Sequence, residues 1–166
     1  MSDYTMPNGS FLGHINFRVQ DLDRSIAFYR DILGLVQTGG FPGKAAFFSS
    51  NPAYYHQIVL TATPNGEKPA GRTIGLDHLA VNLPTKEAFA IAVKRLVDNN
   101  VTITGTADYG HHLAVYLKDP DGIGLELAWD RDPSEWRMEG DRIWFGDPSP
   151  LVIEDLLAEL AVGIGN

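Results

Sequence analysis

The sequence predicts an α+β fold made of two copies of one strand–helix–three-strand unit, followed by a C-terminal helical tail. The prediction rests first on residues 12–19 and 76–83, which align without a gap and place His78 64 residues after His14. Apolar and polar side chains alternate in both segments, which is the pattern of a half-buried strand. A helical pattern and three β-rich stretches then follow each segment.

The two helices have recognisable ends. Asp21 and Thr85 are suited to cap their first turns, because a short side-chain oxygen can accept from a free backbone N–H. Gly34 ends the first helix, and Asn99–Asn100 suit the end of the second. Apolar residues recur every three or four positions, so that each helix presents one face to a sheet: Leu22, Ile26, Tyr29 and Leu33, then Phe89, Val93 and Leu96.

Short β-rich stretches complete each copy. They cover residues 36–38, 45–48 and 56–62 in the first copy and 101–104, 113–118 and 124–129 in the second. The sequence Asp119-Pro120-Asp121-Gly122 predicts a turn between the last two strands.

We expect one domain, residues 1–166, with internal divisions. Module one covers residues 11–63, a linker 64–72, module two 74–129, and a C-terminal extension 130–166. The extension is rich in Pro and Trp and is expected to be irregular up to Ser149–Pro150. There, Ser as cap and Pro in the first turn predict a final helix that runs to about Ala161.

Composition excludes several classes of function. The net charge is −8 without a Lys/Arg cluster, which argues against nucleic-acid binding. The absence of Cys excludes a disulfide framework, a thiolate zinc site and a thiol nucleophile. No apolar run approaches about 18 residues, and residues 1–10 do not read as a signal peptide. We therefore expect a cytoplasmic protein that does not bind membranes.

Four polar side chains stand on strands where a cavity is expected. His14 and His78 lie on the first strands, and His56 and Glu126 on the last, at spacings that suggest equivalent places in the two copies. An ionised carboxylate in an apolar strand is costly unless it is paired. Two imidazoles and one carboxylate, with the other positions open, form the ligand set of non-haem Fe(II) oxygenases.

Taken together in chain order, the motifs of this sequence resemble those of the vicinal-oxygen-chelate superfamily, which includes glyoxalases, bleomycin-resistance proteins and extradiol dioxygenases. The match looks closest to small catechol-2,3-dioxygenase-like proteins. The stretches that carry it are Gly13-His14-Ile15, Val19-Gln20-Asp21-Leu22, Phe28-Tyr29, Leu33-Gly34-Leu35, Asp77-His78-Leu79-Ala80, Tyr116 to Gly122, Leu125-Glu126-Leu127, Asp130-Arg131 and Ser134-Glu135-Trp136.

The resemblance implies two βαβββ modules that form a cupped mixed sheet around a metal site. It places His14, His78 and Glu126 on the Fe(II) ligands, with Mn, Zn, Ni or Co as alternative metals. It places His56 near a second-sphere acid/base group, and Tyr116 on a tyrosine that hydrogen-bonds the substrate. It also makes a homodimer plausible; the tryptophans of the extension and Phe145 are candidates either to cap the site or to form that interface.

One position departs from the pattern of this subgroup. The subgroup usually reads Asp-His-Gly where this chain has Asp108-Tyr109-Gly110. Tyr109 can donate a hydrogen bond but is a poor base at neutral pH, since the ordinary pKa of tyrosine is about 10. His111 or His112 could take over the missing function, so all three are candidate substrate-binding residues.

Three functions follow from these residues. The expected one is an extradiol-type dioxygenase that cleaves a catechol-like ring with O2. A glyoxalase-like lyase or isomerase would be expected to carry a carboxylate base where His56 stands. A non-enzymatic small-molecule binder would gain nothing from an unpaired Glu126. Each site residue also has a plain structural alternative, such as strand packing for His56 or an ordinary sheet aromatic for Tyr116.

Overall fold

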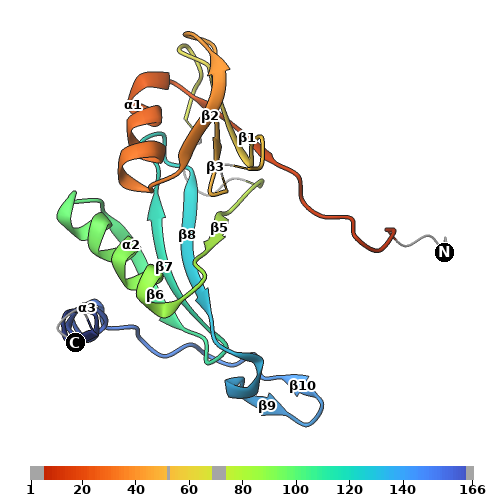
Figure 1. Cartoon of the computed structure of the whole chain (residues 1–166), viewed down its shortest axis with the longest axis vertical. Helices are drawn as coiled ribbons and strands as arrows, with labels where there is room; N and C mark the ends of the chain where they lie inside the picture. Colours follow the sequence, from red (N-terminus) through yellow and green to blue (C-terminus); the bar gives the residue numbers. More distant parts are fainter. Residues whose placement is uncertain (1–5, 52, 69–73, 164–166) are drawn as a thin grey trace. The chain divides into compact units, whose positions relative to one another are not determined.

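The computed structural model describes residues 6–51, 53–68 and 74–163, so part of the predicted linker, residues 69–72, lies outside the described residues. The chain divides into two compact units, Met1–Gly66 and Glu67–Asn166. Each contains a four-stranded mixed sheet and a helix in the order strand, helix, three strands (Figure 1). The predicted α+β fold with a C-terminal helix is therefore confirmed.

The first unit pairs its first strand with its last. Its sheet has the order β1-β4-β3-β2, in which β1 and β4 are parallel and the other neighbours antiparallel. Its elements are β1 (Ile15–Val19), α1 (Leu22–Ala27), the turn η1 (Phe28–Ile32), β2 (Val36–Phe41), β3 (Ala45–Ser49) and β4 (Ile58–Ala62). The predicted cap is present, since the Asp21 carboxylate accepts from the Arg24 N–H.

The predicted first helix changes its hydrogen bonding half-way. From Phe28 it becomes a π-helical turn, in which the Leu33 N–H donates to the Phe28 carbonyl. Gly34, with a φ of +79°, ends it as predicted. The apolar spacing did not reveal the π turn, because it places Tyr29 in the core with either kind of helix.

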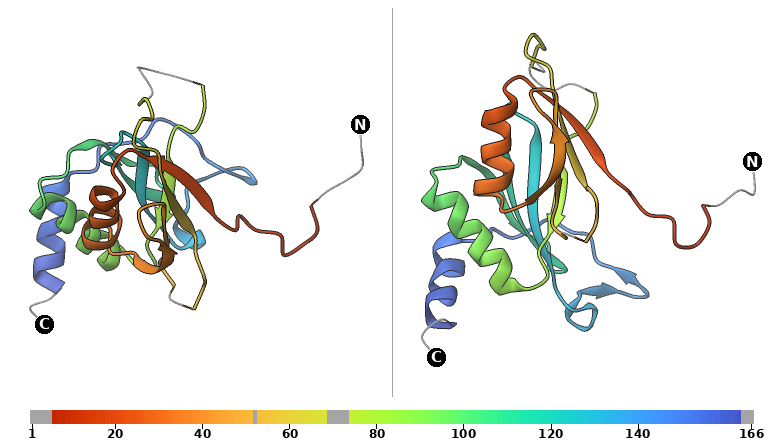
Figure 2. Two further views of the ribbon diagram at one scale, coloured as in Figure 1. Left: turned by 90° about the horizontal axis from the view of Figure 1, so that it is seen from above. Right: turned by 45° about the horizontal axis from the view of Figure 1, so that its top comes forward.

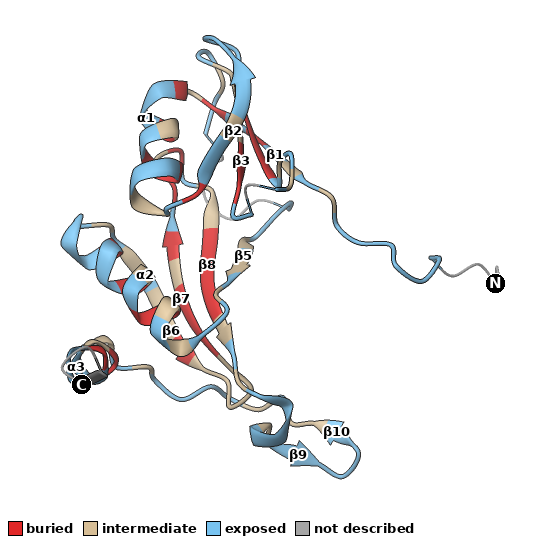
Figure 3. Ribbon diagram, viewed as in Figure 1, coloured by how far each residue is buried: buried red, intermediate tan, exposed pale blue. Residues whose placement is uncertain are grey.

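The second unit repeats this topology, with the order β5-β8-β7-β6 and β5 parallel to β8. Its elements are β5 (Leu79–Asn82), α2 (Lys86–Asp98), β6 (Ile103–Asp108), β7 (His112–Lys118) and β8 (Gly124–Asp130). Thr85 caps α2, and the buried side of this helix supplies Phe89, Val93 and Leu96. Figure 3 shows burial concentrated along β7 and β8.

The strand registers correct one expectation. Ile15 pairs with Ile58 in the first sheet and Leu79 with Leu125 in the second, so the counterpart of Glu126 is Val59. His56 does not share that place, because it lies in the β3–β4 connection before β4 begins. That connection, residues 50–57, is longer than its counterpart, residues 119–123, and residue spacing alone could not show this.

The C-terminal extension is more ordered than predicted. It contains a short 3-10 helix (Pro133–Glu135) and a small hairpin of β9 (Met138–Glu139) and β10 (Arg142–Ile143). The helix α3 (Ile153–Gly163) starts after the predicted Ser149–Pro150. Ser149 does not cap it, because its backbone pairs with that of Asp108 through hydrogen bonds of 2.8 and 3.0 Å that keep the segment extended.

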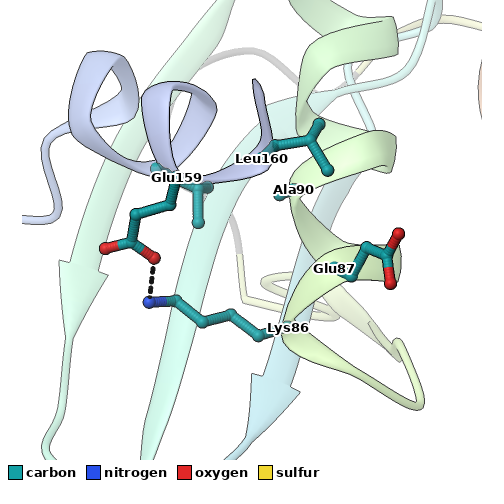
Figure 4. A pocket seen from close by; sticks show the side chains of 6 residues that line it. Lys86, Glu87, Ala90, Glu159 and Leu160 are labelled. Carbon is teal, nitrogen blue, oxygen red and sulfur yellow. Dashed lines mark hydrogen bonds and ion pairs between the residues drawn. The ribbon is translucent and has the colours of Figure 1, made fainter. Parts of the chain in front are cut away.

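Helix α3 lies beside α2 (Figure 2). Its buried residues Leu156 and Leu160 pack on α2. An ion pair between Lys86 and Glu159 also joins the two helices (Figure 4). A cavity of about 230 Å³ remains there, and it is lined by Lys86, Glu87, Ala90, Leu156, Glu159 and Leu160. None of the predicted site residues lines it. No helix of the described residues is long and apolar enough to cross a membrane.

The packing of α3 gives a stability prediction. Leu156→Ala should lower the free energy of unfolding by about 2–4 kcal/mol, because it leaves a hole against α2. Val162→Ala, on the exposed side of α3, is the matched control and should change it by less than about 0.5 kcal/mol. Urea unfolding followed by circular dichroism measures both. Equal effects of the two substitutions would mean that α3 is not held on α2 through Leu156.

Candidate functional site

Glu126 lies in the middle of the polar face of the second sheet. Its register partners are Ala80 on β5 and Tyr116 on β7, so these side chains share its face. The opposite face carries leucines and valines toward α2. Only 5% of Glu126 is exposed, and a buried carboxylate requires a cationic or hydrogen-bonding partner.

His78, just before β5, supplies that partner. Its Nε2 lies 2.9 Å from Oε2 of Glu126, and its Nδ1 lies 2.9 Å from Oδ2 of Asp77. Ionised carboxylates only accept hydrogen bonds, whereas a neutral imidazole has one N–H to donate. The ring can donate Nε2–H to Glu126, or it can donate Nδ1–H to Asp77 and leave the Nε2 lone pair for a metal ion. The second arrangement is the usual way in which a carboxylate orients a metal-binding histidine.

A second histidine stands on the other side of Glu126. The Nε2 atom of His112 lies 3.5 Å from Oε1 of Glu126. Its ring stacks on Tyr109, with 4.6 Å between centroids and 14° between planes. Burial and the neighbouring His111 lower the pKa of His112, although Glu126 opposes them, so the neutral ring is favoured.

Two tyrosine hydroxyls complete this cluster. The hydroxyl oxygens of Tyr109 and Tyr116 lie 3.0 Å apart, and the Tyr116 ring meets His78 edge-on. Burial, followed by the hydrogen bond to Tyr109, raises the pKa of Tyr116 well above its ordinary value. Tyr116 is therefore a neutral hydrogen-bond donor throughout the physiological pH range.

Asp108 holds the turn between β6 and β7, a role that the sequence patterns did not assign to it. Its carboxylate accepts two hydrogen bonds from the Arg131 guanidinium, at 2.7 and 2.8 Å, and one from the Gly110 N–H at 2.8 Å. The Arg131 guanidinium is the main cause that lowers the pKa of Asp108. Sequence patterns do not predict this ion pair, since no motif links residues so far apart in the chain. Asp77, by contrast, could have been found as the immediate neighbour of His78.

His111 lies next to the stacked pair, with its ring centroid 4.7 Å from that of His112 and 6.2 Å from that of Tyr109. Its ring contacts Phe145 of the C-terminal extension at 5.1 Å between centroids. Its Nδ1 atom is buried without a hydrogen-bond partner. Of the two histidines suggested to replace the missing one, it is His112 that stands beside Glu126.

The first unit brings its two histidines together. The rings of His14 and His56 lie 4.8 Å apart, edge to face, and His56 also contacts Phe47 and Tyr55. His14 is exposed, and His56 is partly buried. Among the described residues, no three His, Asp or Glu side chains are placed so as to hold a metal ion together. The joint ligand role of His14, His78 and Glu126 remains a prediction.

Comparison with known proteins identifies the family. Residues 11–127 match the model of the Glyoxalase/Bleomycin resistance protein/Dioxygenase superfamily. The chain belongs to this superfamily. It is similar to the catechol-2,3-dioxygenase of Bacillus subtilis, with 28% identity over 149 residues, which cover 89% of this chain and 51% of that protein. The chain thus spans about half the length of this relative.

Other superfamily members match over more of their own length. The lactoylglutathione lyase of Haemophilus influenzae is 29% identical over 127 residues, 69% of this chain and 88% of that protein. The crystal structure of a glyoxalase/dioxygenase from Nostoc punctiforme superposes with a TM-score of 0.66 at 24% identity, covering 80% of this chain and all of that one. This last likeness concerns the fold alone.

The tyrosine pair gives a pH prediction. Tyr116 should ionise well above pH 10.0, and the stability that its neutral form contributes should be lost as the pH rises from 10.0 toward its folded pKa. Tyr109→Phe should lower that pKa but leave it above 10.0, because burial is the larger cause. Absorbance titration at 295 nm, with Tyr116→Phe to assign the signal, measures this. Ionisation of Tyr116 together with exposed tyrosines would contradict the buried hydroxyl pair.

Proposed function

We propose that this superfamily member is a metal-dependent extradiol-type dioxygenase, which inserts O2 into the ring of a catechol-like diol. The observation that carries the proposal is the imidazole of His78 held between two carboxylates, with Nε2 facing the buried Glu126. This arrangement satisfies every group when a cation shares Nε2 and the carboxylate. It supports metal binding independently of the resemblance to known dioxygenases.

His78 and Glu126 would hold the metal, and His14 is the third ligand predicted from the sequence. The donor set of imidazole nitrogen and carboxylate oxygen suits Fe(II), and also Mn, Zn, Ni or Co. When bound, Fe(II) supplies a Lewis acid that favours the deprotonated diol and a centre at which diol and O2 meet. Asp77 would fix the ring of His78 by accepting its Nδ1–H.

The remaining residues of the polar face bind and orient the substrate. Tyr116, neutral and directly opposite Glu126, can donate a hydrogen bond to a phenolic oxygen. The hydroxyl of Tyr109 keeps that of Tyr116 in place at 3.0 Å. The stacked His112 adds a neutral imidazole beside Glu126, which suits it to exchange a proton with the substrate.

His56 is proposed to act in the first unit as the acid/base group near dioxygen. Its contacts with His14, Phe47 and Tyr55 fix the ring by packing on several sides. Imidazole is the side chain best suited to take and return a proton near neutral pH. A homodimer and a cytoplasmic location remain predictions.

A glyoxalase-like lyase is the second candidate, because the Haemophilus influenzae lyase matches over 88% of its length. That chemistry abstracts a proton from carbon and commonly uses a second carboxylate as the base. In the first unit the counterpart of Glu126 is Val59, and the nearby polar residue is His56, so neither position offers a carboxylate. The first unit therefore favours the dioxygenase.

Oxygen uptake tests the proposal. Protein purified without oxygen and loaded with Fe(II) should consume O2 and form a yellow ring-opened product from catechol or 2,3-dihydroxybiphenyl. Glu126→Gln should abolish metal retention and oxygen uptake without unfolding the chain. Glu87→Gln, the same change on the exposed side of α2, should leave both unaltered.

Three results would count against the proposal. Tight binding of Zn or Ni without oxygen uptake would favour the lyase. Full metal occupancy in the Glu126→Gln variant would remove Glu126 from the ligands. A protein that binds aromatic compounds but no metal would instead be a small-molecule binder.

A further inference from the structure

Both ends of the C-terminal loop, residues 131–149, bind the same residue of the second sheet, Asp108. The loop leaves β8 at Arg131, whose guanidinium binds the Asp108 carboxylate. It returns at Ser149, whose backbone pairs with the backbone of the same Asp108. Most of the intervening residues are exposed (Figure 3), and the match to the superfamily ends at residue 127, before the loop begins.

The turn that Asp108 holds also presents two residues of the polar face. The Tyr109 N–H donates to the His112 carbonyl at 3.0 Å, and the Arg131 N–H donates to the His111 carbonyl at 3.0 Å. Gly110, with a φ of +82°, allows the tight reversal, and its N–H donates to Asp108. The exit of β8, the β6–β7 turn and the return of the loop therefore meet at one residue, Asp108, through its carboxylate and its backbone.

A ring contact also connects the loop to this turn, and two other contacts lie within the loop. The Trp136 indole N–H donates to the Arg131 carbonyl at 2.9 Å, and Phe145 lies against the ring of His111. Arg137 lies over the ring of Trp144 at 4.1 Å, which links the two flanks of the hairpin. The loop thus has internal structure of its own and a packing contact next to His112.

We propose that Asp108 and Arg131 are positioning residues: their ion pair closes the C-terminal loop on the β6–β7 turn and thereby holds the stacked Tyr109 and His112 beside Glu126. The consequence for catalysis rests on the proposed function, whereas the positioning itself does not. Neither residue touches the polar cluster directly, and each acts through the backbone of the turn.

The ion pair has the geometry for this role. Two parallel N–H···O hydrogen bonds fix the guanidinium in one plane, which a single contact would not do. The exposed fractions of the two side chains are 22% and 27%, so water screens the pair less than a fully exposed one. By contrast, Lys94 and Asp98 on α2 form a pair of which each side chain is more than half exposed.

Asp108→Asn is the decisive variant, because it removes the charge but keeps an oxygen that can accept from the Gly110 N–H. Asp98→Asn is the matched control, with the same change in an exposed pair of the same unit. In metal-free protein, NMR should show the ring protons of Tyr109 and His112 moving toward unstacked positions in Asp108→Asn only. Trypsin should cleave at Arg137 and Arg142, which are already exposed, at least about tenfold faster in that variant, since release of the loop lets the backbone around them unfold into the protease.

Steady-state kinetics then measure how the loss of the ion pair affects substrate binding. In Fe(II)-loaded Asp108→Asn, KM for 2,3-dihydroxybiphenyl should rise several-fold while metal content stays that of the native protein. Arg131→Lys keeps the charge but not the paired hydrogen bonds. Its KM should therefore lie between those of the native protein and of Asp108→Asn. A purely structural role would lower the melting temperature without shifting the ring protons or KM.

The outcomes separate this inference from the proposed function. Unchanged ring protons and trypsin cleavage in Asp108→Asn would overturn the positioning role, whatever the reaction. Shifted ring protons and faster cleavage in a protein that never consumes O2 would support the positioning role and count against the dioxygenase alone.

Discussion

The buried carboxylate of Glu126 is the constraint around which the second unit is organised. A strand whose other face packs on α2 gains apolar burial at every second position, and an ionised group between those positions must be neutralised. His78 and His112 meet its two oxygens from neighbouring strands, and Asp77 takes up the remaining nitrogen of His78. Removal of any one of these partners would leave a charge or a lone pair without a match.

Two kinds of structure position the side chains around that carboxylate: the strands of the sheet and the β6–β7 turn. The sheet itself places Tyr116 opposite Glu126 through strand register, so the donor hydroxyl needs no loop to position it. Tyr109 and His112 instead depend on a turn, and turns are softer than strands. The bidentate pair of Asp108 and Arg131 supplies the missing rigidity from a segment that follows residues 11–127, the part matched by the superfamily model.

Local patterns predicted the topology well, since alternation and helical spacing are encoded within each segment. Local backbone chemistry also predicts the caps at Asp21 and Thr85 and the end of the first helix at Gly34. Features that depend on pairing between distant segments could not be predicted. The register that makes Val59 the counterpart of Glu126 depends on the β3–β4 connection, which is longer than the β7–β8 connection of the second unit. The late start of α3 and the partner of Arg131 both depend on contacts with Asp108.

The coordination of bound iron tests the central claim most directly. X-ray absorption at the iron edge of Fe(II)-loaded protein should show nitrogen and oxygen ligands at about 2.0–2.2 Å, with the scattering pattern of imidazole. In His78→Ala, the imidazole contribution should fall and the remaining iron should bind more weakly, whereas His111→Ala should leave the spectrum unaltered. An identical spectrum and affinity in native protein and His78→Ala would show that the cation lies elsewhere.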